Sequence, residues 1–107
     1  MASIDQTDQA REDLREIVRY LRHQSRPAAE RLAKAVKSRL RSLSKSPALG
    51  RERPEFGAGV RNLVVGDYIL IYHLTDTIIT VIRIFHGSRD IETQMRLTDW
   101  EPPNESA

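Results

Sequence analysis

The sequence from residue 60 to residue 85 reads VRNLVVGDYILIYHLTDTIITVIRIF, and this stretch decides the fold. It contains three runs rich in β-branched and aromatic residues, which are typical of strands: Val60–Val65, Tyr68–Leu74 and residues 78–85. Gly66-Asp67 predicts a two-residue hairpin turn between the first two runs. Residues 75–77 turn the chain again before the third. The pattern predicts a meander of three antiparallel strands.

Two amphipathic helices are predicted before this meander. The first begins at a cap on Thr7 or Asp8, and its apolar stripe is Ala10, Leu14, Ile17, Val18 and Leu21. The second covers residues 27–44 behind a cap on Ser25, with the stripe Ala29, Leu32, Ala33, Val36, Leu40 and Leu43. The connector is short, so the helices should form an antiparallel hairpin. We therefore expect an α+β fold, with a helical hairpin packed on a small antiparallel β-sheet.

The two ends of the chain carry weaker patterns. Residues 1–6 contain one large apolar residue, Ile4, besides the initial methionine, and they predict at most a short N-terminal edge strand. Residues 46–59 read as a loop, because they are punctuated by proline and glycine. After Ile91 the pattern fades, so we interpret residues 92–107 as a C-terminal tail whose Trp100 either packs the terminus down or serves as an interface anchor. With 107 residues, the chain should form a single domain over residues 1–107.

The net charge of +2 hides an asymmetry. Residues 22–89 carry 13 lysines and arginines against 5 acids, a balance of +8, whereas the ends carry 4 against 10, a balance of −6. A basic body predicts an acidic partner, either nucleic acid or an acidic protein segment, unless the charge is merely solvated. The chain has no cysteine and no apolar run of membrane-spanning length. Charged residues near its start lead us to expect no signal peptide. We expect a cytoplasmic protein with no membrane role.

Five local patterns, in this order and spacing, resemble the ParE/RelE superfamily of toxins from type II toxin–antitoxin systems. They cover roughly residues 9–91 and are Ala10 with Asp13-Leu14, Ile17 and Tyr20; PALGR at residues 47–51; RPEFGAGVR at residues 53–61; VGDY at residues 65–68 followed by Ile71-Tyr72; and IRIFHGSRDI at residues 82–91. The resemblance is nearest to the ParE branch. One departure is the N-terminus, because members usually open with a clear apolar strand.

A cationic cluster is predicted at the end of the third strand. His86 lies beside Gly87, where a side chain can reach solvent, and we expect a functional surface made of Arg61, Arg83, His86 and Arg89. If the chain cleaves RNA, His86 would act as base or acid while Arg61 and Arg83 hold the phosphate, and Tyr72, partnered by His73, could donate a proton. The simpler interpretation is structural: His86 bonds across a turn, Arg89 pairs with Asp90 or Glu92, and Tyr72 is core.

The resemblance favours a non-enzymatic function. RNA-cleaving members tend to carry a late Tyr or His among lysines, whereas here no Tyr follows Tyr72, no His follows His86 and no Lys follows Lys45. Acids in the tail would repel an RNA backbone. The resemblance therefore implies a ParE-like inhibitor of DNA gyrase that arrests growth, as in plasmid stabilisation. The alternatives are a RelE-like, ribosome-dependent mRNA endoribonuclease, or a decayed toxin that only binds its antitoxin.

The resemblance also implies a partner. A cognate acidic antitoxin, ParD-like or RelB-like, would neutralise the toxin, and DNA would be bound only through the antitoxin complex. We expect this antitoxin to contact Tyr20, the basic face of the second helix and the sheet rim, that is Tyr20, Arg31, Lys34, Arg41, Arg61 and Arg83. No cofactor is implied, and the three histidines are too widely spaced for a metal motif.

Overall fold

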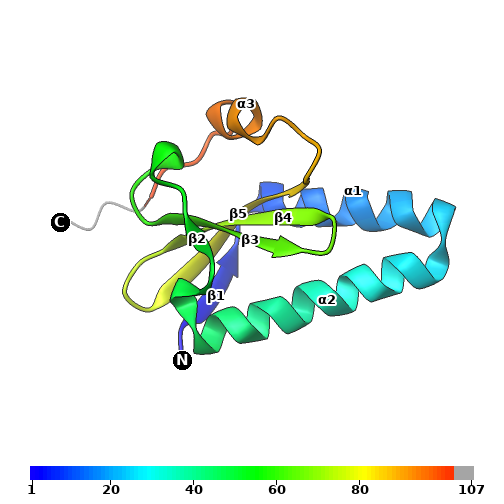
Figure 1. Cartoon of the computed structure of the whole chain (residues 1–107), viewed down its shortest axis with the longest axis horizontal. Helices are drawn as coiled ribbons and strands as arrows, with labels where there is room; N and C mark the ends of the chain where they lie inside the picture. Colours follow the sequence, from blue (N-terminus) through cyan, green and yellow to red (C-terminus); the bar gives the residue numbers. More distant parts are fainter. Residues whose placement is uncertain (103–107) are drawn as a thin grey trace.

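The computed structural model of the chain describes residues 1–102. Two long helices, α1 (Asp8–Gln24) and α2 (Arg26–Lys45), cover one face of a five-stranded sheet, and a short helix, α3 (Ile91–Arg96), covers the other (Figure 1). The strands are β1 (Ser3–Gln6), β2 (Arg51–Glu52), β3 (Val60–Val65), β4 (Tyr68–Leu74) and β5 (Ile78–His86). Their order in the sheet is β1-β5-β4-β3-β2. The α+β fold with a helical hairpin on the sheet is confirmed.

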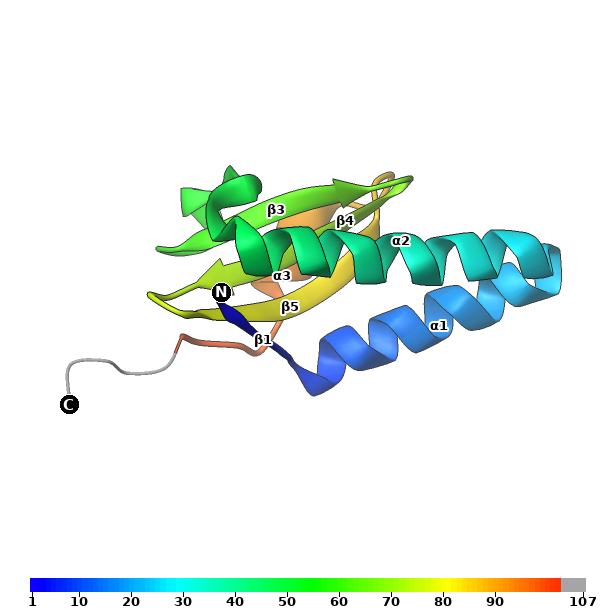
Figure 2. The ribbon, with the colours of Figure 1, turned by 90° about the horizontal axis from the view of Figure 1, so that it is seen from below.

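The two predicted helix caps are present. The Thr7 hydroxyl accepts a hydrogen bond from the Ala10 N–H at 3.0 Å, and the Ser25 hydroxyl accepts one from the Ala28 N–H at 3.3 Å. Ser25 also ends α1, because its own N–H donates to the Leu21 carbonyl. One extended residue thus ends one helix and begins the next. The hairpin tip that it forms extends beyond the sheet (Figure 2).

The meander and the N-terminal strand are confirmed, but the sheet is not wholly antiparallel. β3, β4 and β5 pair antiparallel, with an irregularity in register between Ile71 and Tyr72. β1 pairs with β5 in parallel, from Ser3 opposite Ile78 to Gln6 opposite Val81. Parallel neighbours need a long crossover, and the helical hairpin and the first strands of the meander supply it. The predicted antiparallel meander is therefore present, and the N-terminal edge strand, whose orientation the sequence does not indicate, makes the sheet mixed.

The segment expected to be a plain loop, residues 46–59, contains more structure. Two 3₁₀ turns, Pro47–Leu49 and Pro54–Phe56, flank β2, which pairs antiparallel with Arg61 and Asn62 of β3. The prolines of both turns fit the first position of a helical turn, where no N–H is required. A two-residue strand is too short to leave a periodic signal in the sequence.

Both faces of the sheet are buried. On the α1–α2 side the core contains Leu32, Leu43, Leu70, Tyr72 and Val81. On the other side Val60, Ile71, Ile82 and Phe85 form a second cluster, covered by Phe56, Ile91, Met95 and Trp100. Helix α3 had not been predicted. The packing role expected for Trp100 is confirmed, because its ring lies 5.2 Å from the ring of buried His73.

Part of the segment interpreted as a tail, residues 103–107, lies outside the described residues. Among residues 1–102, no helix has the length and apolar character needed to cross a bilayer.

Candidate functional site

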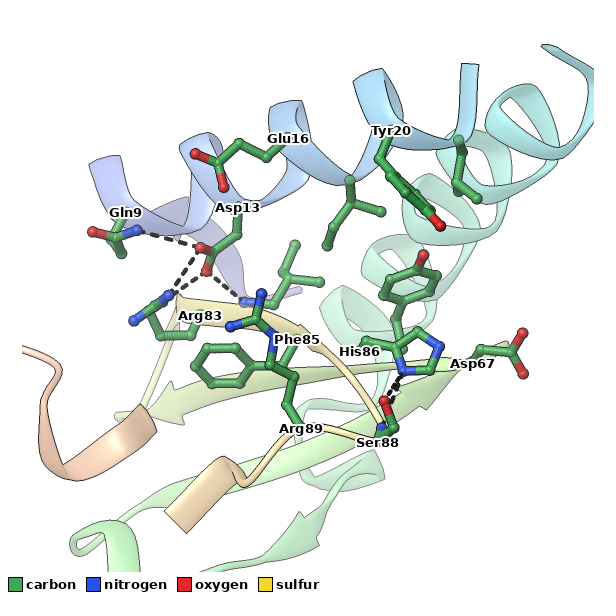
Figure 3. Close-up of a pocket in the computed structure, with 14 residues that line it drawn as sticks. Gln9, Asp13, Glu16, Tyr20, Asp67, Arg83, Phe85, His86, Ser88 and Arg89 are labelled. Atoms are coloured by element: carbon green, nitrogen blue, oxygen red, sulfur yellow. Dashed lines mark hydrogen bonds and ion pairs between the residues drawn. The ribbon is translucent and has the colours of Figure 1, made fainter. Parts of the chain in front are cut away.

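A groove of about 680 Å³ lies between α1 and the ends of β4 and β5 (Figure 3). One wall is a face of α1, and the other is the end of β5 with the turn that follows it. The groove brings together four of the residues expected from the sequence: Tyr20, Arg83, His86 and Arg89. Arg61 and the α2 cations do not line it.

One end of the groove is a buried ion pair between α1 and β5. The Arg83 Nε donates to Asp13 Oδ2 at 2.7 Å and Nη2 donates to Asp13 Oδ1 at 3.0 Å. The side chains are only 14% and 8% exposed. A bidentate arginine–carboxylate pair is among the stronger charged contacts in proteins. A buried pair of this kind holds because each charge satisfies the other, and removing either partner strands a charge in the interior.

The same carboxylate completes the edge of β5. β1 accompanies β5 only as far as Val81, so the backbone beyond it needs another partner. The Ile84 N–H donates to Asp13 Oδ2 at 3.0 Å, and the Thr7 hydroxyl donates to the Ile82 carbonyl at 2.8 Å. Asp13 of α1 and Thr7, which caps the helix, therefore replace the missing strand with side-chain hydrogen bonds.

Arg83 also contacts the C-terminal segment. Its Nη1 donates to the Thr98 hydroxyl at 3.0 Å, and its guanidinium lies 4.5 Å from the centre of the Phe85 ring. Thr98 in turn donates to the Gln94 carbonyl. Arg83 thus connects α1, β5 and the segment after α3, and its donors are largely used by these contacts.

His86 lies at the other end of the groove, where its ring is held by the turn after β5. The Ser88 N–H donates to His86 Nδ1 at 3.1 Å, and the Ser88 hydroxyl lies 2.7 Å from the same nitrogen. A nitrogen that accepts an N–H bond carries no proton, so the neutral ring holds its proton on Nε2. In this geometry His86 offers a donor to the groove, and its basic lone pair is engaged. The interpretation of His86 as bonding across a turn is confirmed.

The accessible side chains near His86 are aromatic and cationic. Tyr20 is 62% exposed, and the Tyr68 ring meets His86 edge-on at 5.2 Å. Burial, followed by the charge of Asp67 and by Tyr20, raises the pKa of Tyr68, so its phenol is neutral at physiological pH. Arg89 is exposed and, among the described residues, has no side-chain partner. This end of the groove combines features common at protein interfaces, namely tyrosine and arginine.

Arg61 lies elsewhere and is engaged. Strand β4 separates its strand, β3, from β5. Its Nη1 donates to the Gly50 carbonyl at 2.8 Å, and its Nη2 lies 3.2 Å from Glu52. Arg61 therefore fastens residues 48–52 to the sheet. The expected rim joining Arg61 with Arg83 and His86 is not assembled in this structure.

Tyr72 belongs to the core beneath that segment. Its hydroxyl donates to the Pro47 carbonyl at 2.8 Å and accepts from the Gly50 N–H at 2.9 Å. A Cβ at residue 50 would lie 2.7 Å from the Tyr72 ring, so only glycine fits there. Burial raises the pKa of the Tyr72 phenol. Tyr72 is completely buried and packs on the α1–α2 side, whereas His73 contacts Trp100 on the other, so they cannot serve as a catalytic pair.

The remaining expected contact residues lie on α2. Arg31, Lys34 and Arg41 are exposed, and none has an ion-pair partner among the described residues. They occupy the face of α2 opposite its buried stripe of Ala29, Leu32, Val36 and Leu43. The groove and this basic face are therefore two separate surfaces.

Sequence reasoning missed the role of Asp13. The signal was present, because Asp13 falls on the apolar stripe of the first helix, between Ala10 and Ile17. A carboxylate in that position is buried and needs a partner. Ser88 and Thr98, which orient His86 and Arg83, gave no signal, because small hydroxyl residues in loops are common.

Comparison with known proteins supports one family. The model of the family "ParE toxin of type II toxin-antitoxin system, parDE" matches residues 4–91. A solved structure titled as the chromosomal ParDE toxin–antitoxin system from P. aeruginosa superposes with a TM-score of 0.66 at 22% identity, covering 80% of this chain and 96% of that one. At this identity the similarity shows the fold alone. A search of curated proteins gives no match.

Two further structures share the fold. The toxin–antitoxin complex RelBE2 from Mycobacterium tuberculosis gives a TM-score of 0.57 at 28% identity, over 79% of this chain and 96% of that one. The E. coli DinJ-YafQ complex gives a TM-score of 0.50 at 21% identity, over 82% of this chain and 96% of that one. The family match extends from β1 to the start of α3 and so includes the whole groove. The chain belongs to the ParE toxin family of type II toxin–antitoxin systems, within the ParE/RelE superfamily.

Proposed function

We propose that the chain inhibits DNA gyrase without being an enzyme, and that a cognate antitoxin neutralises it in the cytoplasm. The observation that carries this proposal is the engagement of Arg83. The phosphate clamp expected for RNA cleavage would use Arg61 and Arg83, yet both guanidinium groups are bound to protein atoms, on strands separated by β4. The family match to ParE toxins points the same way.

A ribonuclease must bring an acid, a base and cations to a single phosphate. Here the lone pair of His86 Nδ1 is engaged by Ser88, and Tyr72 is buried. The sheet face opposite α1 and α2 is covered by α3 and Trp100. An inhibitor needs none of these groups. It needs a shaped surface with a few anchors, and the groove mouth with Tyr20, His86 and Arg89 offers one.

We propose that the same groove mouth contacts gyrase and that the antitoxin blocks it. An amphipathic helix of the antitoxin would lay apolar side chains against Ile17, Leu21 and Tyr68, which line the groove, and an acidic side chain near Arg89. Tyr20 would anchor this contact. The related structures are a ParDE toxin–antitoxin system from P. aeruginosa and the RelBE2 toxin–antitoxin complex from M. tuberculosis, which supports an antitoxin for this chain.

The test compares two targets with the same purified chain. The purified chain should inhibit supercoiling by gyrase or trap the complex of gyrase with cleaved DNA. The same chain should leave mRNA on translating ribosomes intact. Addition of the antitoxin from the adjacent reading frame should restore supercoiling. A chain carrying Tyr20→Ala and Arg89→Ala should lose inhibition, whereas Arg22→Ala, on the exposed end of α1 outside the groove, serves as the matched control.

A RelE-like endoribonuclease is the second candidate, because His86 is exposed at a strand end and the RelBE2 complex is 28% identical. It predicts cuts in mRNA at fixed codon positions on the ribosome, abolished by His86→Ala. Such cuts, with gyrase unaffected, would replace the first proposal. A chain that binds its antitoxin but affects neither target would be a decayed toxin.

A further inference from the structure

The turn after β5 holds a serine hydroxyl against an imidazole. The Ser88 hydroxyl lies 2.7 Å from His86 Nδ1, and Figure 3 shows the two groups facing each other at one end of the groove. The Ser88 N–H also donates to Nδ1, so this nitrogen is the basic one of the neutral ring, and the hydroxyl donates its proton toward it. Both residues are exposed, so an incoming molecule can reach them.

Three further contacts hold this pair in place. The Gly87 N–H donates to the Asp67 carbonyl at 2.8 Å, which fastens the turn after β5 to the turn between β3 and β4. The Arg89 N–H donates to the His86 carbonyl at 3.0 Å and closes the turn. The Tyr68 ring meets the imidazole edge-on. A nucleophile and its base react faster when their geometry is fixed in advance, and here the surrounding turn fixes it.

The other hydroxyl groups have different surroundings. Within residues 1–102, Ser88 is the only hydroxyl residue with an imidazole partner. Most of the other bonded hydroxyls donate to backbone carbonyls, which are very weak bases; these are Ser3, Thr7, Ser42, Ser44, Tyr72, Thr75 and Thr98. The Thr93 hydroxyl donates to the Asp90 carboxylate at 2.7 Å, but that bond lowers the pKa of Asp90 and makes it a poor base. Ser88 is therefore the hydroxyl whose surroundings favour transfer of its proton.

We propose that Ser88 is a modification site, whose hydroxyl accepts a phosphoryl group from a nucleoside triphosphate held by a separate transferase. Ser88 Oγ forms a bond to the γ-phosphorus. The bond between that phosphorus and the oxygen that bridges to the β-phosphate breaks, and the nucleoside diphosphate leaves with this oxygen. The hydroxyl proton passes to His86 Nδ1, which acts as the general base.

The neighbouring cation favours a phosphoryl group over an uncharged acyl group. Arg89 follows Ser88 directly, lines the same groove and has no side-chain partner among the described residues. Negative charge develops on the phosphoryl oxygens during transfer, and a guanidinium stabilises it. The phosphoserine that results carries a charge of about −1.5 to −2 at neutral pH, and it can pair with Arg89 and with the protonated His86 ring.

Phosphorylation of Ser88 would inactivate the open end of the groove, and in this respect the inference rests on the proposed function. The phosphate engages the cation that is proposed to contact gyrase, and it adds negative charge at the same place. Because Ser88 lies in an exposed turn, the core of the protein is not disturbed. The toxin would therefore lose its target while it keeps its fold.

The first experiment measures the reactivity of Ser88 without a transferase. The purified full chain is incubated with a fluorophosphonate, from which a nucleophilic serine oxygen displaces fluoride at phosphorus, and mass spectrometry after trypsin cleavage locates the adduct. Cleavage after Arg83 and Arg89 gives residues 84–89, in which Ser88 is the only hydroxyl residue. Cleavage after Lys45 and Arg51 gives residues 46–51, in which Ser46 is the only one. Ser46 is also exposed but has no imidazole partner among the described residues, so it is a control within the same molecule.

Ser88 should react at least about tenfold faster than Ser46, because a positioned general base typically accelerates such a step by about 100-fold or more. His86→Ala should lower the rate at Ser88 to that at Ser46, and free imidazole in the buffer should restore part of it. His23→Ala removes an exposed histidine outside the groove, and as the matched control it should leave the rate unchanged. The assay uses neither gyrase nor growth, so its failure and the failure of the proposed function can be told apart.

A second experiment tests the consequence for gyrase. Ser88→Glu places a negative charge near the position of the phosphoryl group, and Ser88→Gln has nearly the same size without the charge. The concentration of chain that halves the rate of supercoiling should be higher for Ser88→Glu than for Ser88→Gln. Equal concentrations would contradict inactivation by charge.

Three results of the labelling experiment would overturn the inference. The first is reaction of Ser88 and Ser46 at equal rates. The second is a rate at Ser88 that His86→Ala leaves unchanged. The third is an adduct on the His86 ring in place of Ser88, which would make the imidazole the nucleophile.

Discussion

Arg83 and Arg89 line the same groove, six positions apart in the sequence, and their environments are opposite. The guanidinium of Arg83 is bound to Asp13 and Thr98 and lies over Phe85, whereas Arg89 is exposed and lacks a side-chain partner among the described residues. In the sequence both are arginines at the end of the last strand. What separates them is a carboxylate 70 positions away, which the helical hairpin places against β5.

The comparison shows that the cations clustered in this sequence fall into two groups: some are bound within the structure, and others are exposed. Arg61 and Arg83 are bound within the structure, where each fastens a separate segment to the sheet. Among residues 1–102, Arg89 and the exposed α2 cations Arg31, Lys34 and Arg41 form no ion pair. The predictions below test this division, from the change that should cost most to the one that should cost least.

Breaking the buried ion pair should have the largest effect. Asp13→Ala or Arg83→Ala leaves one charge buried without its partner, which typically costs about 3–5 kcal/mol of the free energy of unfolding. Asp13→Ala also removes the acceptor of the Ile84 N–H. Urea denaturation monitored by circular dichroism measures the loss. If Arg83→Ala costs as little as Arg89→Ala, Arg83 has no structural role.

A substitution that creates a cavity in the core gives a reference for the loss of stability expected when the ion pair is broken. Ile82 is fully buried in the cluster beneath α3. Ile82→Ala should lower the free energy of unfolding by about 2–5 kcal/mol, because it removes buried methylenes and leaves a cavity. The same denaturation experiment measures it. A loss below about 1 kcal/mol would mean that this face of the sheet is loosely packed.

Tyr72→Phe should have a smaller effect. It removes the hydroxyl that accepts from the Gly50 N–H and donates to the Pro47 carbonyl. Leaving a buried group unsatisfied costs about 1–3 kcal/mol. Hydrogen exchange should show faster exchange of the Gly50 amide, while the amides of β5 stay protected. Unchanged exchange at Gly50 would contradict this assignment.

The same residue predicts a pH dependence. Burial raises the pKa of Tyr72 above its ordinary value of 10.0, so the folded state holds this proton more tightly than the unfolded chain does. Its contribution to stability is complete below about pH 10 and is lost as the pH rises from there through the folded pKa. Chemical denaturation at a series of alkaline pH values gives the free energy of unfolding. This free energy should fall less steeply with pH for Tyr72→Phe than for the wild type. Parallel curves would show that Tyr72 does not contribute.

The smallest effect on stability is expected at Arg89. Arg89→Ala should change the free energy of unfolding by no more than about 0.5 kcal/mol, as surface substitutions usually do. Growth inhibition after induction should nevertheless decrease. Arg22→Ala, at a residue that is also exposed but lies outside the groove, should leave both quantities unchanged. An Arg89→Ala chain that unfolds but remains toxic would make Arg89 structural.

The regular elements could be predicted from the sequence because each has a strong local signal. The meander from residue 60 to residue 85 consists of runs rich in β-branched and aromatic residues and turns at Gly66-Asp67, and Thr7 and Ser25 cap their helices as expected. The parallel pairing of β1 could not be predicted. It depends on which edge of the sheet the strand reaches after a long crossover, and four residues with one large apolar side chain do not encode that.

The candidate site was predicted in part, for a similar reason. Residues near the end of β5 could be proposed because strand ends leave side chains accessible, and three of them, Arg83, His86 and Arg89, do meet in one groove with Tyr20 of α1. Their roles could not be assigned. Whether an arginine is bound or free depends on partners far away in the sequence, such as Asp13 for Arg83 and the Gly50 carbonyl for Arg61.

The most direct test of the central claim is the concentration of purified chain that halves the rate of supercoiling by gyrase, compared between the wild type and the Tyr20→Ala, Arg89→Ala double variant. If the open end of the groove is the functional surface, that concentration should rise at least about tenfold, equivalent to about 1.4 kcal/mol of binding, while the free energy of unfolding stays within about 1 kcal/mol of wild type. Equal inhibition by the two chains would contradict the account. So would a wild-type chain that leaves gyrase untouched and cuts ribosome-bound mRNA at fixed codon positions.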